Sequence, residues 1–150
     1  MIQSLTGADV IQLDGRILSD LIDGDTVLLE FPNNIGAVKT GKNGNSIFAF
    51  NATGMNVNVT IRLVMSSPDD KYIQGRLQEW IADPSAFIPF VGQFVKRVGD
   101  GAGNISQNIY NLSGGIPTKI PAAKTNQEGD TEQSVSVYNL SFSNGQRQIT

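Results

Sequence analysis

The strictest pattern in the sequence is the alternation of apolar and polar residues from position 55 to position 65. One set of alternating positions is entirely apolar and comprises Met55, Val57, Val59, Ile61, Leu63 and Met65. Because successive side chains of a strand point to opposite faces, the pattern predicts a β-strand with one face in a core and the other mostly in water. At about 3.3 Å per residue it would reach roughly 36 Å, about twice the usual length. We therefore expect this strand to extend beyond one compact subunit.

Short apolar runs separated by turn residues predict most of the other strands. Two Asp-Gly steps, at positions 14–15 and 23–24, supply the positive φ angles of tight hairpin turns. Strands are expected near residues 10–13, 16–19, 26–31, 35–39, 46–52, 90–98 and 105–112. A final strand is expected within residues 134–150, with a turn at Asn144-Gly145, whereas residues 113–133 resemble a loop with a short extended piece.

One amphipathic helix is predicted at about residues 68–82. Ser67 can cap its start, Asp69 and Asp70 suit the positive end of the helix dipole, and Pro84 ends it. Four apolar residues share one stripe and are expected to face the core, namely Ile73, Leu77, Trp80 and Ile81. The sequence therefore predicts a mainly β fold in a single domain over residues 1–150. We expect a β-sandwich or a partly closed antiparallel β-barrel with this one flanking helix.

The composition excludes most familiar active sites. The chain has no histidine and no cysteine, so the commonest general base, the commonest metal ligand and every thiol are missing. Asp23 and Asp25 are spaced like the start of a calcium loop, but the later ligands are absent and a hairpin turn is the favoured interpretation. We predict neither enzyme activity nor a cofactor. No apolar run approaches the length of a membrane span.

Charge is distributed unevenly along the chain, whose net charge is −3. Residues 1–38 hold six acids against Arg16 alone, whereas residues 39–124 hold nine bases against five acids. The region from residue 39 to residue 46 is a lysine-bearing loop with glycines at its tip, and it leads into the long strand. Long strands with open edges, together with separated acidic and basic regions, are typical of a subunit that assembles with copies of itself. Solvated faces with no partner would give the same pattern.

Residues 43–80, NGNSIFAFNATGMNVNVTIRLVMSSPDDKYIQGRLQEW, resemble the central part of the tail tube proteins of contractile-tailed bacteriophages. The chain length, the Asp-Gly hairpins near the front and the closing strand SVSVYNLSFSN are also similar to that family. The resemblance implies a virion tail protein, assembled in the cytoplasm of the bacterial host, whose hexameric rings stack into a hollow conduit for viral DNA. Its expected partners are further copies of itself, the tail sheath protein, and the baseplate and tail terminator proteins. DNA would pass through without sequence-specific binding.

The resemblance also assigns roles to particular residues. The family places a long hairpin loop against the neighbouring ring, and the matching positions here are Lys39, Gly41, Lys42, Asn43, Gly44, Asn45 and Ser46. The lysines would meet acids of the next ring, with Asp20, Asp23 and Asp25 as the candidates. A conduit for DNA should have a neutral or acidic lining. The polar face of the long strand is therefore the candidate channel lining, namely Asn56, Asn58, Thr60 and Arg62.

Two other classes of protein remain open. The tube subunit of a contractile bacteriocin or of a secretion apparatus would share both the fold and the assembly. A carbohydrate-binding β-sandwich module of a virion would share the strand content, but it would stay a discrete oligomer and expose aromatic side chains in a groove.

Overall fold

The computed structural model describes residues 1–150 apart from 6, 8, 23–25, 124 and 126–130. The described chain consists mainly of antiparallel strands, with one α-helix and three short 3-10 helices. The strands are β1 (Ser4–Leu5), β2 (Val10–Leu13), β3 (Arg16–Ile17), β4 (Val27–Glu30), β5 (Gly36–Thr40), β6 (Ser46–Phe50), β7 (Val57–Val64), β8 (Phe90–Gly99), β9 (Ile105–Pro117) and β10 (Val135–Ile149). The helices are η1 (Ala52–Met55), α1 (Pro68–Ala82), η2 (Pro84–Ala86) and η3 (Thr131–Ser134). The predicted turn at residues 23–24 lies outside the described residues.

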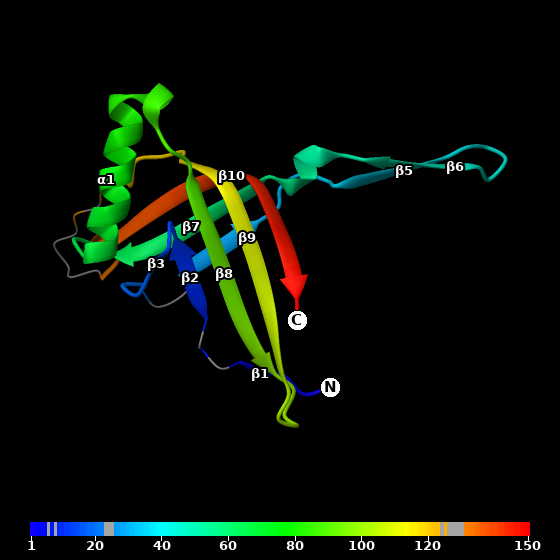
Figure 1. Ribbon diagram of the computed structural model, residues 1–150, viewed down its shortest axis with the longest axis horizontal. Coiled ribbons are helices and arrows are strands. Elements are labelled where there is room, and N and C mark those ends of the chain that lie inside the picture. Colours follow the sequence, from blue (N-terminus) through cyan, green and yellow to red (C-terminus); the bar gives the residue numbers. More distant parts are fainter. Residues whose placement is uncertain (6, 8, 23–25, 124, 126–130) are drawn as a thin grey trace.

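Eight strands form one antiparallel sheet, and the other two form a separate hairpin. The order across the sheet is β3-β2-β8-β9-β10-β7-β4, with β1 paired beside β8, while β5 pairs only with β6. Within the described residues no pairing joins β3 to β4, so the sheet is not a closed barrel. Helix α1 stands at one end of the sheet, and the β5–β6 hairpin projects from the opposite side (Figure 1). The predicted fold class, mainly β with one flanking helix at residues 68–82, is confirmed.

The core is built on the middle of the alternating strand, as predicted, but Met65, predicted on the same face, is exposed. Val57, Val59, Ile61 and Leu63 of β7 are all buried. They belong to one apolar cluster with residues of β2, α1, β8, β9 and β10, completed by Ile11, Leu13, Leu18, Ile73, Leu77, Phe90, Leu112, Tyr138, Leu140 and Phe142. The predicted length of the strand is wrong, since β7 has only 8 residues. Asn51 caps η1 immediately before it, and Ser66, at φ 63°, turns the chain immediately after it.

The predicted core stripe of the helix is correct at its first turns and wrong at its end. Ile73 and Leu77 are buried, and Trp80 packs at the rim of the core against Phe87, with ring centroids 5.3 Å apart. Ile81 is 52% exposed. The chain turns back through η2 after the helix and brings Phe87 onto Trp80, so no core surface remains for Ile81 in the last turn.

Two features of the remaining strands also differ from expectation. Asn144-Gly145 is not a turn, because β10 continues through both residues and pairs them with Ser113 and Leu112 of β9. A Cβ at position 145 would meet the side chains of Val57 and Leu112, so glycine is required here by close packing. Strand β9 likewise continues to Pro117 through a stretch predicted as loop. The turn at Asp14-Gly15 is confirmed, with φ angles of 53° and 80°.

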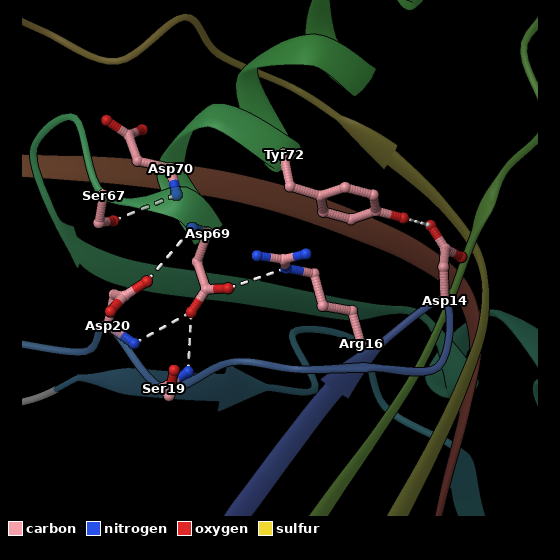
Figure 2. A network of polar contacts seen from close by, with 8 residues as sticks. All are labelled: Asp14, Arg16, Ser19, Asp20, Ser67, Asp69, Asp70 and Tyr72. Atoms are coloured by element: carbon pink, nitrogen blue, oxygen red, sulfur yellow. Dashed lines mark hydrogen bonds and ion pairs between the residues drawn. The ribbon is translucent and has the colours of Figure 1, made fainter.

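The start of α1 is fixed to the sheet by the buried carboxylate of Asp69 (Figure 2). Its oxygens accept hydrogen bonds from the backbone N–H groups of Ser19 (2.7 Å) and Asp20 (3.0 Å) and from Arg16 Nε (2.9 Å). Burial by itself raises the pKa of Asp69, but these donors outweigh it and hold the pKa below its ordinary value. The ionised carboxylate therefore ties the first turn of the helix to the segment that follows β3.

The neighbouring carboxylate of Asp70 binds strand β10 and the turn that follows β7. Its oxygens accept hydrogen bonds from the Ser66 N–H (2.8 Å), from Ser136 Oγ (3.1 Å) and from the hydroxyl of Tyr138. Burial, and then the adjacent Asp70 carboxylate, raise the pKa of Tyr138 far above its ordinary value, so the phenol stays protonated as a donor. The hydrogen bonds of Asp70 with Ser66, Ser136 and Tyr138 therefore stabilise the packing of α1 on the sheet.

Replacing Tyr138 with phenylalanine should destabilise the protein without altering its shape. The change removes a donor from a buried carboxylate, which costs about 1–3 kcal/mol. Urea unfolding at neutral pH measures the loss. Tyr72→Phe is the matched control, since its hydroxyl also bonds to a carboxylate, that of Asp14 (3.0 Å), but at an exposed site. A loss for Tyr138→Phe no larger than for Tyr72→Phe would contradict this account.

The stability of the protein should also fall in acid because of Asp69. A carboxyl group whose pKa is lowered by folding stabilises the native state above its unfolded pKa of about 3.9, and this contribution is lost as the pH falls through the folded pKa. Urea unfolding between neutral pH and strong acid should show a smaller acid loss for Asp69→Asn than for the parent. Glu79→Gln, at an exposed ion pair with Arg76, is the control and should follow the parent curve. Parallel curves for the parent and Asp69→Asn would refute the assignment.

Candidate assembly interface

The β5–β6 hairpin stands clear of the sheet as an arm (Figure 1). All residues of both strands are exposed, and the five cross-strand pairs run from Gly36 opposite Phe50 to Thr40 opposite Ser46. A two-stranded hairpin with no face in a core is at best marginally stable in water. The arm therefore lacks, within one subunit, the packing that would hold it.

The loop residues that the resemblance assigned to ring contact all lie toward the tip of this arm. Lys39 is in β5, Ser46 begins β6, and the intervening tip is closed by a hydrogen bond from the Gly41 N–H to the Asn45 oxygen (2.7 Å). The structure thus brings together Lys39, Gly41, Lys42, Asn43, Gly44, Asn45 and Ser46 on an exposed hairpin end. Their contact with a neighbouring ring stays a prediction.

Sequence reasoning missed the apolar side chains behind the tip. Phe48 is 79% exposed, Phe50 73%, Ile47 68% and Val38 67%. Val38 lies opposite Phe48, so these two and Phe50 share one face of the arm, while Ile47 lies on the other face opposite Lys39. The signal was present in the sequence, since Ile47 to Phe50 is a continuous apolar run where a half-buried strand would alternate. We call Val38, Phe48 and Phe50 the apolar arm face.

The base of the arm is closed by hydrogen bonds among residues 33–53. The Asn51 N–H donates to the Ile35 oxygen (2.8 Å), and the Asn51 side chain caps η1 by accepting from the Thr53 N–H (3.2 Å). Asn33 Nδ2, in the segment between β4 and β5, donates to the Thr53 oxygen (3.2 Å). These bonds join the two ends of the hairpin beside η1, the short helix that leads into β7.

A second candidate interface is the last part of β10. Pairing of β10 with β7 ends at Phe142 opposite Val57, whereas its pairing with β9 continues to Ile149 opposite Asn108. Among the described residues no strand pairs with the other side of residues 143–149, which leaves an open edge. A groove of about 530 Å³ runs beside this edge, and its walls include Phe31, Ile35 and Met55 at the base of the arm. An open edge beside apolar walls can accept an added strand.

Three of the channel-lining candidates, Asn58, Thr60 and Arg62, lie on the outward face of β7, and Asn56 caps the end of η1 just before it. Asn58 is exposed, while Asn56, Thr60 and Arg62 are half-buried, and Thr60 Oγ1 bonds to Asn139 Oδ1 of β10 (3.2 Å). Asn58 and Thr60 line a shallow hollow of about 270 Å³. Two charged residues, Glu30 and Lys119, line the same hollow.

The structure describes one of the three acids predicted to meet the lysines. The Asp20 carboxylate accepts a hydrogen bond from the Asp69 N–H (3.3 Å), and the Asp20 backbone oxygen accepts from the Val64 N–H (3.0 Å). This carboxylate already serves the helix start within its own subunit. Asp23 and Asp25 lie outside the described residues, so their role stays a prediction.

Comparison with models of protein families and with curated proteins gave no match for this chain. None of the helices in the described part of the chain is long and apolar enough to cross a membrane. The geometry of the arm and of the open edge is therefore the basis for a functional assignment. Both surfaces are suited to contact with another protein chain through backbone pairing and apolar burial.

Hydrogen exchange should separate the arm from the body of the isolated subunit. Amides of β5 and β6 should exchange almost as fast as in an unfolded chain, whereas those of β7 and the first half of β10 should be protected up to global unfolding. Replacing residues 36–50 with a short Gly-Ser turn should change the unfolding free energy by less than about 1 kcal/mol, because no buried side chain is removed. Strong protection of β5 and β6 in the monomer would contradict this description.

Proposed function

We propose that the protein is the structural subunit of the tail tube of a contractile-tailed bacteriophage. In this proposal hexameric rings stack into a hollow conduit through which viral DNA leaves. The observation that carries it is the exposed arm, which has three large apolar side chains on one face that no other described part of the chain covers. Its location is the virion tail, after assembly in the cytoplasm of the bacterial host.

Burial of the apolar arm face supplies a driving force for assembly. Fully burying one side chain of the size of valine or phenylalanine contributes about 1.5–3 kcal/mol. Several such side chains on a strand pair can offset the cost of ordering the arm and holding two subunits together. A second copy is the partner that is always present at the same concentration. Burial against it removes the aggregation hazard that an exposed apolar hairpin would otherwise present.

The open strand edges support closed rings and stacked rings. The edge at residues 143–149 differs from the edges at β3 and β4, so a contact that joins unlike edges is heterologous and closes into a ring when the rotation allows. Lys39 and Lys42 place positive charge toward the tip of the arm. This charge would be complementary to an acidic surface on the neighbouring ring. The sheath, baseplate and tail terminator proteins are the further partners in this proposal. A bacteriocin or secretion tube would use the same surfaces, and genomic neighbours would distinguish it.

Electron microscopy of the purified protein across a concentration series tests the proposal. Hollow filaments or six-fold rings are expected from the parent chain. Phe48→Ser combined with Phe50→Ser should abolish them, because the apolar arm face is lost, and should leave the unfolding temperature of the monomer unchanged. Ile88→Ser is the matched control, since Ile88 is equally exposed at 73% but lies outside the arm, and it should still assemble.

A parent protein that stays a discrete small oligomer under all conditions would contradict the tube and favour a binding module. If the Phe48→Ser, Phe50→Ser variant forms tubes as well as the parent does, the proposed role of the arm is wrong. The proposal that the protein forms a tube would then still hold.

A further inference from the structure

Four carboxamide side chains lie in one row across four neighbouring strands. Gln12 of β2 is opposite Gln93 of β8, Gln93 is opposite Asn111 of β9, and Asn111 is opposite Gln146 of β10. Gln93 Nε2 donates a hydrogen bond to Asn111 Oδ1 (3.1 Å). Residues that are directly opposite in adjacent strands point to the same face of a sheet. We call these four residues the carboxamide row.

The surface around the carboxamide row is polar and uncharged. The row lines a shallow hollow of about 440 Å³ together with Ser113, Asn144 and Val91. None of the described residues that line this hollow is charged or aromatic. Val95 and Ile109, opposite each other, occupy the next position along β8 and β9, and the first cation on this side of β8 is the half-buried Arg97 beyond them. Neutral side chains thus cover the middle of the sheet.

Three of the four strands that carry the row are long, whereas β2 has 4 residues. Strand β8 has 10 residues, β9 has 13 and β10 has 15, against 8 in β7. At about 3.3 Å per residue the two longest reach roughly 40 Å or more. The length that the sequence suggested for the alternating strand is therefore found in these strands instead.

A wall of this kind suits the passage of DNA. Each lysine or arginine that contacts a phosphate adds salt-dependent affinity, and aromatic side chains stack on exposed bases, so either would retain the cargo. Neutral carboxamides and hydroxyls stay hydrated and offer neither interaction. The outward face of β7 is less suitable, because Glu30 and Lys119 line the hollow beside Asn58 and Thr60, and Arg62 lies on the same face.

We propose that the carboxamide row, in place of the β7 residues, faces the channel and forms an uncharged lining along which nucleic acid slides. The inference rests on the proposed tube. It assigns the inner wall to β2, β8, β9 and β10.

Single cysteines can test this assignment because the chain contains none of its own. Asn111→Cys and Gln146→Cys replace exposed members of the row, and Asn58→Cys places the same group on the exposed β7 face as the matched comparison. Each variant is labelled as free subunit and as assembled tube, with N-ethylmaleimide and with a maleimide polymer too large to enter the channel. In tubes the polymer should label the row at least about tenfold more slowly than in subunits, because only tube ends and transient openings admit it. N-ethylmaleimide should remain reactive with the row, and Asn58→Cys should remain reactive with both reagents.

Each other result overturns the assignment in a distinct way. Unchanged polymer labelling of the row places it on the outside of the tube. Loss of labelling by both reagents, or failure of Asn111→Cys and Gln146→Cys to assemble while the parent does, makes the row a contact between subunits. Failure of the parent chain to form any tube contradicts the proposed function itself. Without a tube there is no channel, so the assignment of the row to a channel lining fails with it.

Discussion

The rest of the fold depends on two adjacent buried carboxylates at the start of α1, the one α-helix among the described residues. Asp69 binds the segment after β3, and Asp70 binds β10 through Ser136 and Tyr138, so one helical turn connects two parts of the sheet that are distant in sequence. A buried carboxylate is costly unless donors surround it, and here they do. The helix that they anchor closes the apolar cluster around β7, and the closed body is the platform from which the arm projects.

The arm and the body therefore differ in the origin of their stability. The body has its own core and a hydrogen-bonded helix start, whereas β5 and β6 bury nothing within the subunit. In the proposed tube a neighbouring copy would order this arm, whose base is closed by the Asn51 hydrogen bonds. This division lets one chain remain folded before assembly and gain further order during it, as the proposed tube requires.

Charge follows the same division between surfaces. Two lysines, Lys39 and Lys42, lie in the arm, while a row of carboxamides crosses the middle of the long-stranded face. In the proposed tube the charged surfaces would select neighbouring subunits, and the neutral surface would let a polyanion pass. The lining inference depends on the tube, whereas the tube does not depend on the lining, so the assignment of the carboxamide row can fail while the tube proposal stands.

The sequence by itself determined the elements whose signals are local. The alternation in β7, the capped helix at residues 68–82 and the Asp14-Gly15 turn follow from side-chain period, capping and backbone sterics, which act between near neighbours. Only the tertiary structure decided which strands adjoin. Strand β10 runs through Asn144-Gly145, because Gly145 packs against Val57. Ile81 has no core surface to contact and is exposed. The tertiary structure exposed Phe48 and aligned Gln12, Gln93, Asn111 and Gln146, since burial and register depend on contacts between residues far apart in the chain.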